Sequence, residues 1–173
     1  MEMNSTERTV RLRAIEPEDL DMLYGIENDM TMWNIGVTNV PYSRYVLHDY
    51  VANSKFDIYT DRQVRLIVED ENSKTIGIAD LTEFSPKHLR AETGIVITTP
   101  ARGKGYATAA LTELCRYARK ELNIHQLYAI IAKDNTEALN AYGKAGFSET
   151  AVLKEWLQEE NKYKDAVVMQ IFF

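Results

Sequence analysis

The sequence predicts a mixed α/β (α+β) protein with seven strands and four helices. Stretches with the two-residue apolar alternation of strands are interspersed with stretches at helical spacing, in the order β-α-α-β-β-β-α-β-α-β-β. The 173 residues contain no internal repeat and no Gly/Ser linker. Because this length is typical of one ordinary domain, we expect a single domain over residues 1–173.

The first half predicts one strand, two helices and three strands. Apolar and basic residues alternate over residues 9–14, which favours a strand. Pro17, followed by two acidic residues, and Pro41 with Ser43 are typical helix starts. Beyond residue 61 the apolar period becomes two, and this predicts strands over residues 64–69, 75–84 and 90–98.

The second half predicts a loop, two helices and three strands. The loop at residues 100–105 leads into a helix over residues 106–122 with one apolar stripe: Ala107, Leu111, Leu114 and Ala118. A strand over residues 126–132 and a helix over residues 136–145, stopped by Gly146, come next. Strands over residues 147–156 and 163–173, joined by a turn at residues 158–162, end the chain.

The composition limits the partners and the compartment. A formal net charge of −6 argues against nucleic acid or an anionic membrane as the main partner, and it is compatible with a cationic substrate. The single cysteine, Cys115, excludes an internal disulfide framework and a cysteine-based zinc site. No stretch approaches the ~18 apolar residues of a membrane helix. Residues 1–10 carry acidic side chains and no apolar stretch, so we expect no signal peptide and a cytoplasmic protein.

The most informative segment is Arg102-Gly103-Lys104-Gly105, between an expected buried strand and a helix start. Glycines there let the backbone approach a ligand, and the N–H groups of the first helical turn then point at an anion. A phosphate or pyrophosphate site is one interpretation, and an ordinary strand-to-helix turn is the other. A P-loop needs Ser or Thr directly after Gly-Lys, but Gly103-Lys104 is followed by Gly105 and Tyr106. Thr108 stands where the dinucleotide fingerprint needs its third glycine. Neither of those two motifs fits.

Two sequence blocks resemble the GNAT N-acetyltransferases. Arg102, Gly105 and Ala107 occupy the places of that family's acetyl-CoA signature. A second family block follows one expected helix and strand later: Asn135, Ala138, Tyr142, Lys144, Gly146 and Phe147. The resemblance implies the GNAT acyl-CoA N-acyltransferase fold, with a central mixed, mostly antiparallel sheet of about seven strands flanked by four helices. It also implies acetyl-CoA as co-substrate, with no metal expected.

The resemblance implies a role for each matching residue. The backbone of Ile95, Val96 and Ile97 would hold the pantetheine arm and the acetyl carbonyl. Asn135 would hydrogen-bond the same arm, and Ala138 and Lys144 would belong to the same binding surface. The pyrophosphate would lie on one continuous loop: Arg102, Gly103, Lys104, Gly105, Tyr106, Ala107 and Thr108.

Tyr142 is the expected general acid, a role that the resemblance implies and that elementary chemistry supports. Acetyl transfer to an amine releases a thiolate, and a neutral tyrosine with a usual pKa of about 10 holds a proton to donate at neutral pH. Tyr142 lies seven residues after Asn135, two turns along one helix, so both side chains address one ligand. The alternative is a half-buried core tyrosine.

Glu92 and Glu83 are the expected base and acceptor-binding residues. A primary amine is almost entirely protonated at neutral pH, and deprotonating it costs about 4.6 kcal/mol. A carboxylate or a water chain must therefore take that proton. Glu92 should point to the same face as Val96 and opposite to Ile95. Its alternative role is a structural ion pair with Arg90, and that of Glu83 is a solvated strand end.

The resemblance extends to the acceptor. The stretches from Arg90 to Gly105 and from Tyr163 to Met169 resemble most closely the spermidine and diamine N-acetyltransferases, with the ribosomal-protein N-acetyltransferases as close relatives. We therefore predict acetyl transfer to a primary amine by direct attack, with a polyamine or diamine such as spermidine as acceptor. Asn39 and Val40 stand where the polyamine enzymes typically carry acidic residues.

Two alternatives to that function remain at this stage. One is acetylation of a protein or peptide N-terminus, as in the ribosomal-protein relatives. The other is a CoA-binding module without catalysis, against which Tyr142 and Asn135 argue, because a binder needs no acid. The resemblance also implies a homo-oligomer.

Overall fold

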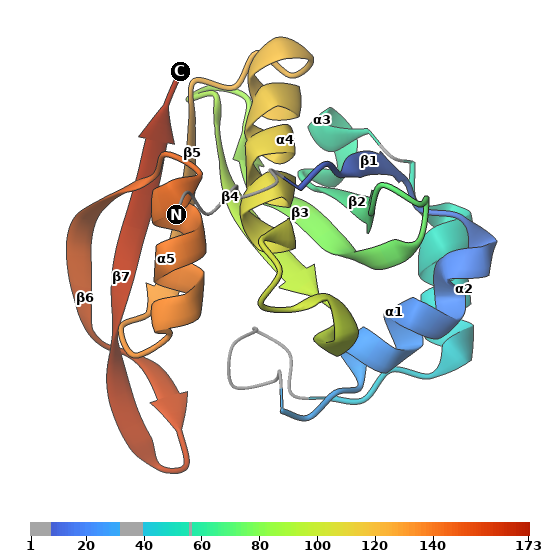
Figure 1. The fold of residues 1–173 in the computed structure, drawn as a ribbon, viewed down its shortest axis with the longest axis horizontal. Helices are drawn as coiled ribbons and strands as arrows, with labels where there is room; N and C mark the ends of the chain where they lie inside the picture. The colour runs from blue at the N-terminus through green and yellow to red at the C-terminus, as the bar shows by residue number, and fades with distance from the viewer. Residues whose placement is uncertain (1–7, 32–39, 56) are drawn as a thin grey trace, which may run out of the picture.

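A seven-stranded sheet runs through the molecule in this computed structural model, which describes residues 8–31, 40–55 and 57–173 (Figure 1). Two parts of the sequence analysis lie outside the described residues. They are Asn39 and residues 1–7, which make up most of the N-terminal segment considered as a signal peptide. The strands are β1 (Arg11–Ala14), β2 (Val64–Glu69), β3 (Thr75–Ser85), β4 (Arg90–Ile97), β5 (Gln126–Ala132), β6 (Ser148–Glu159) and β7 (Lys162–Phe172).

The sheet order is β1-β2-β3-β4-β5-β7-β6. Every neighbouring pair is antiparallel except β4 and β5, which run parallel. The predicted mixed, mostly antiparallel sheet of seven strands is therefore confirmed.

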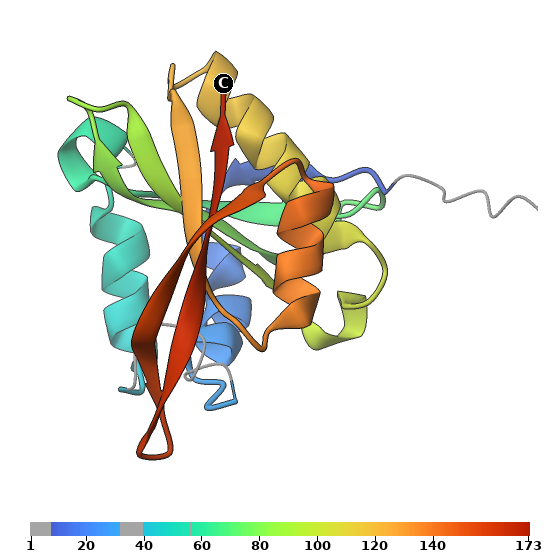
Figure 2. The same ribbon diagram turned by 90° about the vertical axis from the view of Figure 1, so that its left-hand side faces the viewer.

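Helices cover both faces of this sheet. They are α1 (Leu20–Glu27), α2 (Arg44–Asn53), α3 (Ile58–Asp61), α4 (Tyr106–Lys120) and α5 (Thr136–Lys144), with 3₁₀ turns at Pro17–Asp19 and Thr99–Ala101. In Figure 2, α2 and α5 lie on opposite sides of the strands. Across the described ranges, no helix is both long and apolar enough to span a bilayer.

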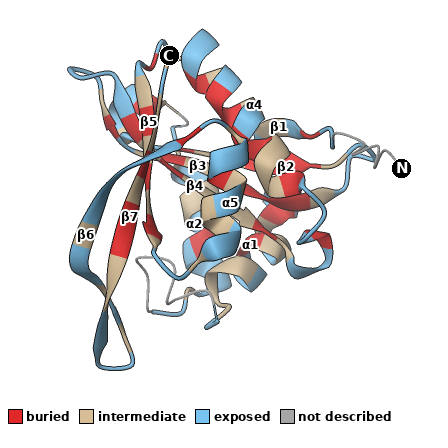
Figure 3. Ribbon diagram, turned by 60° about the vertical axis from the view of Figure 1, so that its left-hand side comes forward, coloured by how far each residue is buried: buried red, intermediate tan, exposed pale blue. Residues whose placement is uncertain are grey.

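Each face has its own apolar core. On the α4 side, Leu81, Leu111 and Leu127 belong to a large buried cluster. On the α1–α2 side, Leu23 and Leu47 pack in a smaller cluster with residues of β2 and β3. The sheet is thus buried on both sides at its centre, as Figure 3 shows by its red strands.

Local signals explain most element ends. Ser43 caps α2, its hydroxyl accepting a hydrogen bond from the Val46 N–H at 3.1 Å. Gly146, at φ +100°, ends α5 in the left-handed conformation, as predicted. The prediction of four helices missed α3, a single turn capped by Asp57 that is too short to show a period.

The C-terminal hairpin is longer than predicted. The expected five-residue turn is only Glu160-Asn161, both at positive φ (48° and 64°), the geometry that matches the twist of a two-residue hairpin. Strands β6 and β7 therefore project beyond the sheet (Figure 2), with Trp156 and Tyr163 exposed on their surface.

Candidate active site

Strands β4 and β5 separate soon after they meet. Their register has only three pairs, from Arg90–Gln126 to Glu92–Tyr128. Beyond that point, β4 continues along β3 as far as Ile97, and β5 continues along β7. We call the place where they part the split.

The split leaves backbone groups of β4 without a strand partner. Because N–H and C=O groups of successive residues point to opposite neighbours, Thr93, Ile95 and Ile97 face the side that β5 has left. The Tyr142 hydroxyl donates to the Thr93 carbonyl at 3.0 Å, and Arg102 Nε donates to the Ile97 carbonyl at 2.8 Å. Side chains thus occupy both ends of the split, with Ile95 between them.

Tyr142 reaches the split from α5 through the apolar core. Its side chain is buried and meets Phe147 edge to face, with ring centroids 5.0 Å apart. Burial is the largest influence on its pKa and raises it, while the neighbouring Thr93 acts in the opposite direction. The phenol is therefore neutral at pH 7 and holds a proton beside the split.

The loop before α4 has the geometry of an anion site. Gly105 caps the helix in the left-handed conformation at φ +87°, and Gly103 lies at φ +72°. No side chain of the described residues caps this helix, so the first-turn N–H groups keep their capacity for an anionic ligand. Lys104 Nζ donates to the Pro100 carbonyl at 2.8 Å, which places a cation on the loop.

The side chain of Tyr106 points away from the expected ligand. It is buried, and its hydroxyl hydrogen-bonds the Glu71 carboxylate at 3.1 Å, with Arg8 over its ring at 5.1 Å. Only its backbone faces the loop. Sequence reasoning missed Arg8 and Glu71, because no motif connects them to residue 106.

The second family block is partly structural. Asn135 is the N-cap of α5, and its Oδ1 accepts from the Ala138 N–H at 3.1 Å. This hydrogen bond uses the Ala138 backbone and leaves the Asn135 amide NH₂ group for a ligand. Lys144 lies at the opposite end of α5 and is exposed.

Glu92 lies on the α1–α2 side of the sheet. Val96 packs in the α1–α2 cluster and Ile95 against the α4 cluster, so Glu92 shares the face of Val96, as predicted. Burial, and then the charge of Glu83, raise the pKa of the Glu92 carboxyl. Within the described ranges, Glu92 forms no ion pair with Arg90.

Glu83 and Tyr128 complete an acidic group around Glu92. Glu83 sits at a register shift between β3 and β4 with φ +50°, and such bulges redirect side chains. Tyr128 is the register partner of Glu92, and its pKa is raised by burial and then by the charges of Glu92 and Glu83. These three side chains influence one another on the face of the split that α1 and α2 flank.

Arg65 neutralises the next carboxylates along that face. It forms a two-point ion pair with Asp80 at 2.9 and 2.8 Å and also bonds Glu27. A cavity of about 240 Å³ opens between α1 and the end of β4. Apolar and charged side chains line it together, among them Met22, Ile26, Val96, Asp21, Asp29 and Arg102. In the described part of the chain, no three or more His, Cys, Asp or Glu residues are placed to hold a metal.

Comparison with known proteins identifies this arrangement. The family description "Acetyltransferase (GNAT) domain" matches residues 9–148. The chain belongs to the GNAT acetyltransferase family. A spermidine N(1)-acetyltransferase of Escherichia coli K12 is 32% identical over 165 residues, covering 95% of this chain and 86% of the relative. A Vibrio cholerae spermidine N(1)-acetyltransferase is 29% identical over 160 residues, covering 92% and 91% of the two chains.

Solved GNAT structures confirm the predicted fold. The crystal structure of spermidine N-acetyltransferase from Vibrio cholerae in complex with CoA and spermine matches with a TM-score of 0.85 at 28% identity, covering 95% of each chain. The 173-residue chain is therefore an N-acetyltransferase. The alternative of a CoA-binding module without catalysis is excluded.

Proposed function

We propose that the protein transfers the acetyl group of acetyl-CoA to a primary amine of a polyamine or diamine such as spermidine. The observation that carries this proposal is the split, which has a neutral Tyr142 hydroxyl at one end and an acidic group on the face flanked by α1 and α2. The names of the relatives support the acceptor class: two of them are spermidine acetyltransferases, and one was crystallised with CoA and spermine.

In this proposal the co-substrate lies along the split. Its pyrophosphate binds the uncapped first turn of α4 and the loop from Arg102 to Gly105. The pantetheine arm takes the backbone groups of Ile95 that β5 leaves unpaired, and the Asn135 amide NH₂ holds the same arm. Direct contacts from Ala138 and Lys144 stay predictions.

The chemistry needs two proton transfers away from nitrogen and one onto sulfur. The acceptor ammonium loses one proton, its lone pair attacks the thioester carbonyl, and the nitrogen of the adduct loses a second proton as the C–S bond breaks. Tyr142 protonates the departing sulfur and regains a proton from solvent. One proton is released per acetyl group transferred.

Glu92 is the proposed proton acceptor, directly or through water. Its raised pKa makes it a stronger base than an ordinary carboxylate, and the charge of Glu83 reinforces the effect. Glu83 is exposed and binds a distal ammonium of the acceptor. A polyamine fits these groups because it combines cations with apolar methylenes, and the neighbouring cavity is lined by both carboxylates (Asp21 and Asp29) and apolar side chains (Met22 and Ile26).

An amine panel tests the acceptor. Release of free thiol from acetyl-CoA is measured with spermidine, spermine, short diamines, aminoglycosides and N-terminal peptides. We expect kcat/KM for a polyamine or diamine to exceed that for every peptide by about 10-fold or more, a difference of about 1.4 kcal/mol in transition-state binding. Preference for a peptide would make the protein an N-terminal acetyltransferase.

A matched pair of glycine substitutions tests the loop. Gly105→Ala and Gly146→Ala both place a Cβ at positive φ, so both carry backbone strain. Only Gly105 belongs to the proposed pyrophosphate site. Calorimetry should show weaker acetyl-CoA binding for Gly105→Ala alone, and equal losses in both variants would assign the effect to strain.

The same proposal includes a single domain over residues 1–173 and a cytoplasmic homo-oligomer. Both rest on length and on the family resemblance. Sedimentation velocity at micromolar concentration should give a mass that is a multiple of 19.8 kDa, and a monomer would contradict the oligomer.

A further inference from the structure

Thr93 carries an unexplained polar group beside the split. Its side chain is 4% exposed, and its Oγ1 is the one buried side-chain oxygen or nitrogen in the described part of the chain without a hydrogen-bond partner. Nearly all such groups in folded proteins are paired, because an unpaired one lowers stability. An unpaired hydroxyl beside the split therefore suggests a role in function.

Thr93 is also the residue that holds Tyr142. Its carbonyl accepts the hydrogen bond of the Tyr142 hydroxyl at 3.0 Å, and both residues are buried, Tyr142 at 6% exposure. Thr93 is the first residue of β4 beyond the last pair with β5. One residue therefore presents a carbonyl and a spare hydroxyl at the same end of the split.

The hydroxyl of Thr93 acts on the ionisation of Tyr142. It lowers the pKa of the phenol, in opposition to burial, and so favours the phenolate. No complete hydrogen bond exists between the two hydroxyls while Tyr142 directs its proton to the Thr93 carbonyl. A phenolate oxygen accepts hydrogen bonds more strongly than a neutral phenol, so the Thr93 hydroxyl gains most from this contact once Tyr142 has given up its proton.

We propose that Thr93 is a positioning residue for proton delivery: its hydroxyl donates to Tyr142 Oη as Tyr142 transfers its proton to the departing sulfur. This inference rests on the proposed role of Tyr142 as the general acid. The Tyr142 O–H bond breaks, the S–H bond forms, and the electron pair stays on the phenolate oxygen. Thr93 keeps its own proton, and solvent later reprotonates Tyr142.

An interaction made only in the charged state accelerates the chemical step without tightening substrate binding. The carbonyl and the hydroxyl of Thr93 then have successive tasks. The carbonyl orients the neutral phenol before reaction, and the hydroxyl stabilises the phenolate after transfer. The unsatisfied hydroxyl lowers the stability of the resting protein, a known trade-off at active sites.

Two conservative changes at residue 93 test the inference. Thr93→Val keeps the shape and removes the hydroxyl, while Thr93→Ser keeps the hydroxyl and removes a methyl group. Both are prepared in the native chain and in Tyr142→Phe. Turnover is measured with saturating spermidine, or the best amine of the panel, and gives kcat and the KM for acetyl-CoA. Calorimetry gives the CoA affinity, and a thermal melt gives the melting temperature of the free protein.

We expect Thr93→Val to lower kcat by roughly 10-fold, the scale of one hydrogen bond to a charged group. KM and CoA affinity should stay within about twofold, since the contact is absent from the ground state. The melting temperature should be equal or higher, and Thr93→Ser should recover most of kcat. In the Tyr142→Phe background, Thr93→Val should have no further effect on kcat.

The inference is overturned if Thr93→Val lowers the melting temperature and leaves kcat unchanged, because the hydroxyl is then structural. It is equally overturned if Thr93→Ser fails to recover kcat, or if the effect of Thr93→Val persists in Tyr142→Phe. Near-normal turnover of Tyr142→Phe alone removes the acid role itself, a result distinct from a failure confined to Thr93.

Discussion

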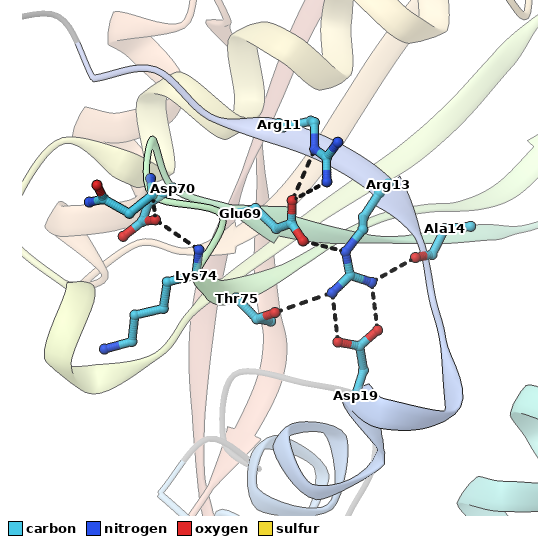
Figure 4. Close-up of polar contacts among 9 residues, drawn as sticks. Arg11, Arg13, Ala14, Asp19, Glu69, Asp70, Lys74 and Thr75 are labelled. Carbon is cyan, nitrogen blue, oxygen red and sulfur yellow. Dashed lines mark hydrogen bonds and ion pairs between the residues drawn. The ribbon is translucent and has the colours of Figure 1, made fainter.

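Two carboxylates on the same sheet, Glu69 and Glu92, behave in opposite ways. Glu69 on β2 accepts hydrogen bonds from Arg11 and Arg13, and Arg13 extends the cluster to Asp19 at 2.7 and 2.8 Å (Figure 4). The pKa of Glu69 is lowered, chiefly by the hydrogen bond from Arg13. Among the residues that the structure describes, no arginine pairs with Glu92 on β4, and burial raises its pKa.

The difference shows that burial alone does not fix the proton affinity of a carboxylate. Around Glu69, the arginine cluster (Arg11, Arg13, Asp19 and Glu69) satisfies its charges internally and ties β1 to β2 and to the start of α1. Around the split, a carboxylate, a phenol and a hydroxyl keep hydrogen-bonding capacity. We therefore expect substitutions in the arginine cluster to affect stability and substitutions at the split to affect turnover.

Tyr142→Phe should give the largest effect. Loss of a positioned general acid lowers kcat by roughly 100-fold. The ring and its packing remain, so the free energy of unfolding should fall by at most about 1–2 kcal/mol for the lost hydrogen bond. Turnover assays and urea denaturation measure the two quantities. Tyr117→Phe on α4, outside the site, is the control, and near-normal turnover of Tyr142→Phe would make that residue a core tyrosine.

Arg13→Leu should give the opposite pattern. It leaves Asp19 and Glu69 buried without their shared partner, which costs about 2 kcal/mol of unfolding free energy once partial solvent access is allowed for. The kcat should not change. Arg116→Leu, which removes an exposed ion pair with Glu113, should change stability far less in the same urea titration. A fall in kcat for Arg13→Leu would contradict the separation of the two regions.

The pH dependence of stability should have opposite signs at the two carboxylates. The lowered pKa of Glu69 contributes stability above its usual value of 4.5, and this is lost as pH falls through the folded-state value. Glu69→Gln should thus be less stable than the native chain at pH 7, with the gap narrowing in acid. The raised pKa of Glu92 makes its ionisation unfavourable to folding as pH rises above 4.5. Glu92→Gln should therefore be the more stable chain at pH 7, and the same sign for both variants would refute the contrast.

A change of salt concentration should give the smallest effect, and it should act on acceptor binding at the split. If the acceptor is a polycation, its KM should rise several-fold between low salt and about 0.5 M, because screening acts over about 8 Å at 0.15 M and less at higher concentration. A monoamine acceptor serves as control and should respond less. A flat response for spermidine would argue against attraction by Glu83 and Glu92.

Much of the fold follows from local patterns. The predicted bounds of β2 and β5 are correct, because β5 alternates regularly between buried and half-buried residues and β2 ends at the polar turn of residues 70–74. The predicted end of β6 was three residues short because most of β6 is exposed and carries no burial pattern, whereas β7 is displaced by only one residue. Helix α3 was not predicted, because four residues are too few to show a helical period.

The site was predictable where it depends on motif residues and not where it depends on register. Family spacing singled out the loop and Tyr142, and the structure places Tyr142 and Arg102 of the loop beside the split. Thr93 was missed because no motif distinguishes it from the other polar residues of β4, and its role depends on where the β4–β5 pairing ends, which the sequence does not show. The acceptor-binding role of Glu83 stays a prediction, and the bulge at this residue depends on how β3 pairs with β4.

The short ladder between β4 and β5 also gives the sheet an edge in its interior. Open strand edges invite pairing with foreign chains and hence aggregation. Tyr142 and Arg102 close the two ends of this edge, and in the proposed binding mode the pantetheine arm fills the middle as a substitute strand. A ligand that binds only the folded chain stabilises it by mass action. The cellular supply of acetyl-CoA would then govern how long each enzyme molecule survives, in addition to how fast it works.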